Sequence, residues 1–216
     1  MRHAPFPVLR QESDPSTLSD LFSGAKNLQR HAPGHAIVVE GDPVTHLFQV
    51  VAGTVRSCSF TEQGRRQIFR FARAGDIFGL IDIDHWHYTA EAVDAVILRS
   101  ISKQAFDNAL DGSRALRRDL RMRVGDLTAE RERHLTFLAF ESAEQRLGWF
   151  LRNFSAGRAD DGFLTLPMTR QEIGDYLGLS LETVSRAFGS LKRAGVIEMR
   201  GAEKYRLVAQ QSKIAA

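Results

Sequence analysis

The sequence predicts an α+β fold with three parts: an N-terminal β-roll of the jelly-roll type, a long helix, and a C-terminal winged helix-turn-helix. Short β-type runs separated by glycine fill residues 33–101, which is typical of a roll or barrel. An uninterrupted helical pattern comes next, then two short helices and a hairpin. We expect a leader over 1–19, a β-roll domain over 20–110, the long helix over 111–140, the winged domain over 141–209 and a tail over 210–216.

The composition is that of an ordinary soluble protein with one large or two modest domains. Of the 216 residues, 43% are hydrophobic and 25% are charged, and no apolar run approaches the roughly 20 residues of a membrane span. The first residues contain no apolar segment of a secretion signal, so we expect a cytoplasmic protein without a membrane partner. The net charge of +3 is weak evidence for a polyanionic partner, so a nucleic-acid function must rest on a motif.

Within the β-roll, glycines at positions such as Gly41, Gly53, Gly64 and Gly75 mark the turns between strands. Strands are expected at 36–39, 46–52, 54–60, 66–72, 88–93 and 95–101. Residues 20–30 are expected to form a short helix, and the leader before it to be mobile or loosely docked.

The long helix contains a heptad seam, in which core positions recur at steps of three and four residues. The seam predicts pairing with a second copy of the chain, and its polar members Arg131 and His134 would fix the register. The alternative is a connector that packs on the β-roll. The seam consists of Leu116, Leu120, Val124, Leu127, Arg131, His134 and Leu138.

Two short helices joined by a tight turn follow. Thr169 and Glu172 form a T-x-x-E capping box that starts the first helix, and Gly178 permits a sharp break because glycine adopts a positive φ without steric cost. Ser180 caps the second helix and Gly195 ends it. The buried faces are expected to consist of Ile173, Tyr176 and Leu177 in the first helix and Val184, Phe188 and Leu191 in the second.

The neighbouring segments complete a winged domain. A second capping box, Ser142 and Gln145, predicts a helix that runs through residue 154. A strand is expected at 163–166, and a hairpin around Gly201 at 196–199 and 205–208 would form the wing.

Three polar residues share one face near the start of the second helix. Glu182, Ser185 and Arg186 stand at i, i+3 and i+4, and a helix-turn-helix presents this part of its second helix to the major groove of DNA. Arginine can bind guanine O6 and N7, glutamate accepts from cytosine N4, and serine can do either. The alternative is an ordinary helical hairpin with a solvated polar face. The residues expected to contact the DNA backbone are Thr169, Arg170, Ser180, Thr183, Lys192 and Lys204.

The motif Glu182-x-x-Ser185-Arg186 resembles the E-x-x-S-R signature of the Fnr/FixK branch of the Crp/Fnr superfamily of bacterial regulators. The catabolite-activator branch has R-E-x-x-x-R instead, and Leu181 stands where its first arginine would be. The roll is similar to the cyclic-nucleotide-binding domain of that superfamily in Gly53, in Gly64-Arg65-Arg66 and in Gly75-Asp76-Ile77-Phe78-Gly79. The resemblance covers residues 20–208.

The resemblance implies a homodimeric transcription regulator whose dimerisation helix lies at 111–140. It implies a palindromic double-stranded DNA site of the TTGAT-N4-ATCAA type, and control of low-oxygen, nitrogen-oxide or nitrogen-fixation genes. Activation through RNA polymerase is the expected mode. We expect no enzymatic activity, since the sequence contains no nucleophile elbow, phosphate-binding loop or zinc-protease motif.

The roll departs from the pattern of cyclic-nucleotide binders. Leu80 follows Phe78-Gly79 where that family has a ribose-binding glutamate, and Tyr88 stands where it has a phosphate-binding arginine. Loss of the arginine removes a charge-assisted bidentate pair, so we expect no response to cyclic AMP. Residues 88–92 look like the corresponding run of the FixK group. The residues of a candidate effector pocket are Leu80, His85, His87 and Tyr88.

We expect no resident cofactor or metal. Haem is the alternative, because haem-binding relatives take an axial histidine from the region of His85 and His87. One cysteine, Cys58, excludes a four-thiolate iron–sulfur cluster, and we expect an inert, partly buried thiol, with a redox switch as the alternative. Asp82 and Asp84 alternate in a loop and are interpreted as a solvated turn.

Overall fold

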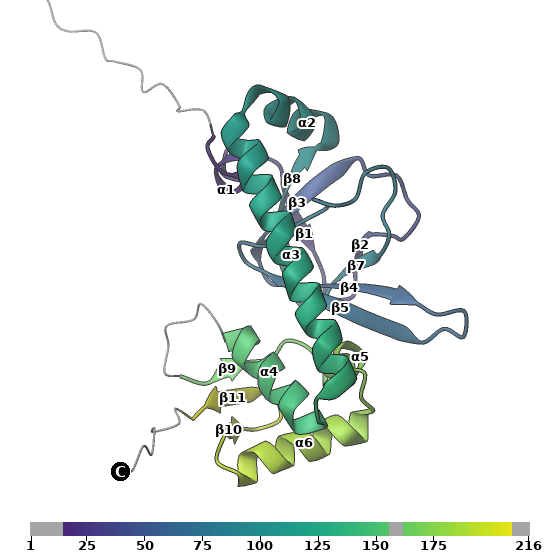
Figure 1. Cartoon of the computed structure of the whole chain (residues 1–216), viewed down its shortest axis with the longest axis vertical. Helices are drawn as coiled ribbons and strands as arrows, with labels where there is room; N and C mark the ends of the chain where they lie inside the picture. The colour runs from purple at the N-terminus through teal and green to yellow at the C-terminus, as the bar shows by residue number, and fades with distance from the viewer. Residues whose placement is uncertain (1–14, 156–161, 209–216) are drawn as a thin grey trace, which may run out of the picture.

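The computed structural model describes residues 15–155 and 162–208, and it has the α+β architecture that the sequence predicts. A β-roll forms the upper part of the molecule, one long helix runs down its side, and a small domain of three helices and three strands lies below (Figure 1). The predicted leader up to residue 14 and the predicted tail lie outside the described residues.

The β-roll consists of two four-stranded antiparallel sheets. Their strand orders are β1-β8-β3-β6 and β2-β7-β4-β5. Val50, Val55, Ala90 and Leu98 belong to the apolar cluster of the roll, and each is at most 1% exposed. The strands are β1 (Leu28–His31), β2 (Ala36–Val38), β3 (His46–Ala52), β4 (Thr54–Phe60), β5 (Arg66–Arg73), β6 (Ile77–Phe78), β7 (Thr89–Ala92) and β8 (Val96–Ser102).

All six predicted strands are present within one residue at each end, but the start of the roll differs from the prediction. The helix expected at 20–30 is instead α1 (Leu18–Ser23), followed by strand β1, which pairs with β8. Leu18 is fully buried, so the folded part begins before residue 20. Strand β6 was not predicted, because its two residues are too few to show a periodicity.

The long helix begins later than predicted. Ser113 separates α2 (Lys103–Gly112) from α3 (Arg114–Phe140), and its hydroxyl caps α3 by accepting from the amide of Leu116 at 3.3 Å. Helix α3 passes along the β-roll and reaches the lower domain (Figure 1). It therefore connects the two parts of the chain.

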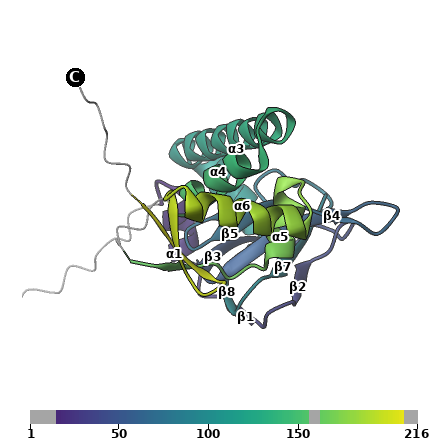
Figure 2. The same cartoon turned by 90° about the horizontal axis from the view of Figure 1, so that it is seen from below.

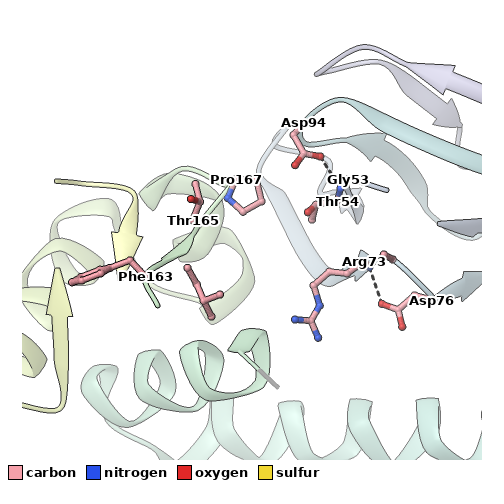
Figure 3. Close-up of a pocket in the computed structure, with 10 residues that line it drawn as sticks. Gly53, Thr54, Arg73, Asp76, Asp94, Phe163, Thr165 and Pro167 are labelled. Atoms are coloured by element: carbon pink, nitrogen blue, oxygen red, sulfur yellow. Dashed lines mark hydrogen bonds between the residues drawn. The ribbon is translucent and has the colours of Figure 1, made fainter. Parts of the chain in front are cut away.

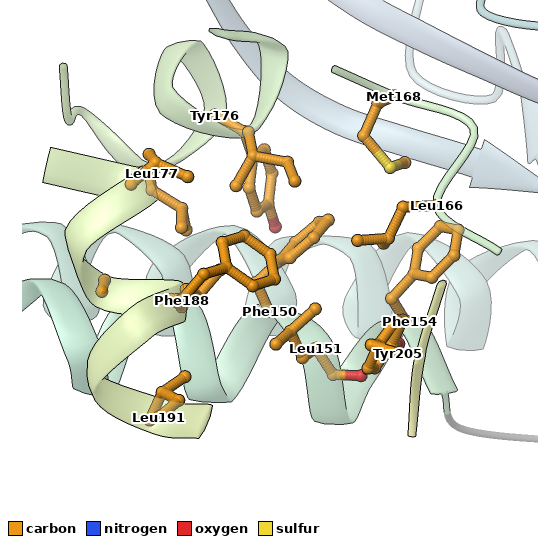
Figure 4. Close-up of a cluster of buried hydrophobic side chains, with 14 of the residues drawn as sticks. Phe150, Leu151, Phe154, Leu166, Met168, Tyr176, Leu177, Phe188, Leu191 and Tyr205 are labelled. Atoms are coloured by element: carbon orange, nitrogen blue, oxygen red, sulfur yellow. The ribbon is translucent and has the colours of Figure 1, made fainter. Parts of the chain in front are cut away.

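The lower domain is built on one apolar cluster. It contains α4 (Ala143–Ser155), β9 (Leu164–Thr165), α5 (Arg170–Leu177), α6 (Leu181–Arg193), β10 (Ile197–Arg200) and β11 (Lys204–Leu207), with the sheet order β10-β11-β9. Phe150 and Leu151 from α4 meet Tyr176 from α5 and Phe188 from α6 in this cluster (Figure 4). Cys58 and Ile68 of the roll belong to the same cluster, so the two domains share part of their core.

Candidate nucleic-acid interface

Helices α5 and α6 form the helix-turn-helix that the capping pattern predicts. The Thr169 hydroxyl accepts from the amide of Glu172 at 3.2 Å, and the Glu172 carboxylate accepts from the amide of Thr169 at 2.6 Å. Gly178 ends α5 in the left-handed conformation, with φ of 64°. Ser180 caps α6 by accepting from the amide of Thr183 at 3.2 Å. The turn is thus fixed by local hydrogen bonds at both helix ends.

Helix α6 lies across the lower surface of the molecule, as the view from below shows (Figure 2). Glu182, Ser185 and Arg186 are exposed, whereas Val184, Phe188 and Leu191 are buried, as predicted. The pKa of Glu182 is lowered because its carboxylate accepts from its own backbone amide and from the Ser180 hydroxyl. The carboxylate is therefore ionised and is a suitable acceptor for a base amino group.

Four of the residues predicted to contact the DNA backbone are exposed around this face. Thr169 and Ser180 occupy the N-caps of α5 and α6, where the unpaired backbone amides of a helix attract anions. Lys192 lies in the last turn of α6, and Lys204 begins strand β11 of the wing. Thr183 is half-buried, and its hydroxyl lies 3.0 Å from that of Ser180.

Arg170 occupies a different position from the predicted phosphate contact. Its guanidinium lies over the Phe188 ring, 3.1 Å from the ring centroid, and donates to the carbonyl of Ala202 in the wing at 2.6 Å. Burial lowers the pKa of Arg170 to about 10, and its Nη1 has no hydrogen-bond partner among the described residues. Arg170 therefore joins the start of α5 to the tip of the wing.

The predicted seam of α3 is only partly available to a second copy of the chain. Leu116 is 1% exposed and packs in a cluster with Leu18 and Phe22 of α1. His134 is 7% exposed: its ring stacks on Tyr176, with centroids 4.2 Å apart, and its Nε2 donates to the Tyr176 carbonyl at 3.0 Å. The prediction for these two positions was wrong, because they face the chain's own domains.

The other five positions of the seam line the edge of this buried strip. Leu120, Val124, Leu127 and Leu138 are half-buried, and Arg131 is exposed. Leu135, which the heptad pattern omits, is 66% exposed and lines one pocket together with Arg131 and Leu138. The accessible edge of the helix is thus rotated from the predicted seam.

The four residues of the candidate effector pocket do not line one cavity. Tyr88 is 4% exposed and packs edge-on against Phe69, and burial raises its pKa. His85 and His87 are both exposed, and His87 pairs through Nδ1 with Asp82. Leu80 packs against the cluster of α1 and α2. The Tyr88 side chain therefore occupies the interior of the roll at this position.

Asp82 and Cys58 are both more buried than predicted. The Asp82 side chain is fully buried beside His87, so it is no solvated turn. Cys58 is fully buried, and burial and the nearby Glu91 carboxylate raise the pKa of its thiol to about 11, which disfavours a reactive thiolate. Within 15–155 and 162–208, no three histidine, cysteine, aspartate or glutamate side chains gather as a metal site would require.

A cleft of about 710 Å³ opens between the roll and strand β9, but its polar groups are largely paired (Figure 3). Asp94 accepts from the amide of Thr54 at 2.7 Å, and Asp76 accepts from the amide of Arg73 at 2.8 Å. None of the predicted effector residues lines this cleft. Across the described ranges, no helix is both long and apolar enough to span a bilayer.

The fold and the exposed face of α6 define a DNA-binding regulator with a winged helix-turn-helix. The family model of the cyclic nucleotide-binding domain matches residues 28–113, and that of the Crp-like helix-turn-helix domain matches residues 145–211. The chain belongs to the Crp/Fnr family of transcription regulators.

Several relatives cover nearly the whole chain. The electron transport regulator A of Shewanella oneidensis is 32% identical over 97% of this chain and 84% of its own length. The fumarate and nitrate reduction regulatory protein of Escherichia coli K12 is 31% identical over 91% of this chain and 79% of its own length. The solved structure of FixK2 from Bradyrhizobium japonicum has a TM-score of 0.82 and 33% identity, over 86% of this chain and 93% of that one.

Proposed function

We propose that the protein binds a palindrome of the TTGAT-N4-ATCAA type as a homodimer and activates transcription from it. The observation that carries the proposal is the exposed trio of Glu182, Ser185 and Arg186 on one face of a capped α6. In this docking, each protomer places α6 in the major groove, with the two half-sites roughly 34–36 Å apart. Leu181, which is 41% exposed, offers an apolar contact suited to a thymine methyl group.

The test compares the base preferences of two variants on a randomised operator library at several salt concentrations. Arg186→Ala should lose about 1–3 kcal/mol of binding free energy and relax the preference at one guanine in each half-site. Lys192→Ala should weaken binding to all sequences alike and reduce the salt dependence by about one unit. If Arg186→Ala keeps the wild-type preference at every position, α6 does not dock as proposed.

The dimer would form along the accessible edge of α3. Val124, Arg131, Leu135 and Leu138 lie along one side of this helix, because they are spaced by three, four or seven residues. Leu135 on this side is 66% exposed, and a second α3 would cover it.

The protein would act in the cytoplasm. The genes that it controls would serve low-oxygen, nitrogen-oxide or nitrogen-fixation metabolism. Support comes from relatives named for electron transport and for fumarate and nitrate reduction. Genome-wide occupancy and transcript levels, compared between low and high oxygen, test this assignment. If activation works through direct contact with RNA polymerase, the DNA-bound dimer should recruit purified polymerase to the promoter.

A ligand-sensing role for the roll is the second candidate. A pocket of about 440 Å³ between the roll and α3 is lined by Phe69, His87, Arg131 and Leu135 among others. His85 lines neither this pocket nor the cleft of Figure 3, so the two histidines do not form a paired haem site. A Soret band in the purified protein would favour haem. Calorimetry with cyclic AMP should show no binding, because Leu80 and Tyr88 supply neither of the charged groups it requires.

A further inference from the structure

The β-roll and the helix-turn-helix are joined by a largely buried arginine that no sequence pattern marked. Arg56 of β4 donates through Nε to Glu91 of the neighbouring strand β7 at 2.7 Å, and through Nη1 to Glu172 of α5. The three side chains are 13%, 18% and 9% exposed. One guanidinium thus binds one carboxylate from each domain, in a place where water competes little.

Glu172 already has a role in the local structure of α5. Its Oε2 accepts from the amide and the hydroxyl of Thr169, while its Oε1 accepts from Arg56. The same carboxylate therefore closes the capping box of α5 and binds the roll. Since α5 and α6 are packed through a shared core, the orientation of the whole helix-turn-helix follows the position of Glu172.

Further contacts from the neighbouring strand β5 reinforce this junction. Arg66 of β5 binds Asp175 of α5 at 2.9 Å, and Gln67 donates to the Asp175 backbone carbonyl at 2.7 Å. Phe71, the β5 residue that faces Arg56 across the two strands, has its ring 5.5 Å from that of Tyr176. A row of contacts along β4 and β5 therefore fixes α5 in angle as well as in distance.

We propose that Arg56 is a positioning residue that sets the half-site spacing the dimer accepts. A dimer reads two half-sites at a fixed separation only if each helix-turn-helix is held rigidly relative to the dimer helix. The roll packs on α3 and holds α5 through Arg56, so it supplies that rigidity. Without Arg56, each α6 still reads its half-site, but the dimer also binds half-sites at other separations.

The experiment rests on the proposed DNA-binding function. The choice of DNA duplexes separates that function from the role of Arg56 in half-site spacing. Affinity is measured for duplexes that carry the four-base-pair spacer, spacers shortened or lengthened by two base pairs, and a single half-site. Glu172→Gln keeps the capping hydrogen bonds, because glutamine also serves in a capping box, but it removes the ion pair. Arg56→Lys keeps the charge but loses the planar fork that binds two carboxylates.

For both variants, the preference for the four-base-pair spacer over the altered spacers should fall by at least about fivefold, the low end of coupling between linked sites. Affinity for a single half-site and base preference within it should stay unchanged. The matched control is Arg70→Ala, on β5, because the hydrogen bond and ion pair of Arg70 go to Ile77 and Asp76, both within the roll. This variant should keep the wild-type spacing preference.

Two results would overturn the inference. One is a uniform loss of affinity for all spacers and the single half-site, which would mean that Arg56 only stabilises the fold. The other is a wild-type spacing preference in both variants. Failure of the wild-type protein to bind any of these duplexes would instead reject the proposed function.

Discussion

Arg170 shows how an expected DNA contact can have a structural role. Its guanidinium is held between the Phe188 ring and the Ala202 carbonyl, so we expect it to fix the wing rather than to bind a phosphate. Arg170→Ala should lower the free energy of unfolding by about 1–3 kcal/mol, since it removes a desolvated cation–π contact and a charged hydrogen bond. Chemical denaturation measures this loss.

The salt dependence of DNA binding distinguishes the two roles of Arg170. A phosphate contact would reduce the salt slope by about one unit when removed, whereas a wing support leaves the slope unchanged and lowers affinity at all salt concentrations. Lys204→Ala is the comparison, because this exposed wing lysine is expected to bind a phosphate and should reduce the slope. A reduced slope for Arg170→Ala would contradict our interpretation.

The buried His134 makes stability depend on pH. Burial lowers its pKa below the ordinary value of 6.5, so the folded chain binds fewer protons than the unfolded chain as the pH falls through that value. The contribution of His134 to stability is therefore complete above about pH 7 and is lost progressively below about pH 6.5.

Replacing this histidine should weaken the acid sensitivity. His134→Gln keeps a donor for the Tyr176 carbonyl, and its free energy of unfolding should fall less than that of the wild type between about pH 7 and 5. His85→Gln, at an exposed position, is the control for the histidine-to-glutamine replacement itself. Equal slopes for His134→Gln and the wild type would show that another group titrates.

At the residue scale, the sequence predicted the polar face of α6 but not the partners of buried polar groups. Glu182, Ser185 and Arg186 could be placed together because helical spacing alone puts them on one face. The ion pairs of Arg56 depend on β4, β7 and α5, which come together only in the folded chain. No local pattern carries that information.

At the scale of elements, local hydrogen bonds decided what could be predicted. Both capping boxes, Thr169 with Glu172 and Ser142 with Gln145, form as expected, because all their atoms lie within one helical turn. The short strands β1 and β6 were missed, since four and two residues are too few to show a strand periodicity, and only pairing with β8 and β3 defines them. Ser113 is a helix cap of the type that a sequence can reveal, but the heptad pattern concealed it.

The tight turn of the helix-turn-helix depends on Gly174, for which the sequence pattern alone predicts no special role. A Cβ at this position would lie 2.5 Å from the backbone carbonyl oxygen of Leu179, and that backbone is held by a 3.0 Å hydrogen bond to Gly174 itself. Gly174→Ala should therefore destabilise the domain by about 1–3 kcal/mol, despite the better helix propensity of alanine.

Gly125 in α3 provides the matched control for thermal denaturation. A Cβ there meets no atom within 4 Å, so Gly125→Ala should be neutral or stabilise by up to about 1 kcal/mol. If Gly174→Ala proves as stable as Gly125→Ala, the turn has room that the structure does not show.

At the scale of the whole molecule, the order of the domains could be predicted but their contact could not. Turn glycines and heptad spacing are local signals, and they placed the roll, the helix and the winged domain in the right order. The shared core, in which Cys58 and Ile68 meet the winged domain, joins residues about a hundred positions apart. Part of the predicted seam is buried because α3 also packs on its own chain, at Leu116 against α1 and at His134 against Tyr176.

The packing of α3 makes a definite prediction for the dimer. Leu135→Asp places a carboxylate at the centre of the accessible edge, where a second α3 would bury it without a partner. The cost of roughly 3 kcal/mol should raise the dimer dissociation constant about a hundredfold. Sedimentation at low micromolar concentration should then show mainly monomer, and DNA affinity should fall because the two half-sites are no longer bound together.

Met122→Asp is the matched control on the same helix. Met122 is 53% exposed and lies nine residues before Arg131, on the opposite face at roughly 100° per residue. It is thus a large apolar side chain of similar exposure that a dimer formed on the Leu135 edge would leave in water. Met122→Asp should remain dimeric and keep its affinity for the palindrome. Should Met122→Asp dissociate while Leu135→Asp stays dimeric, the two copies pair through the opposite face, and the two recognition helices must then be placed on DNA differently from the arrangement proposed here.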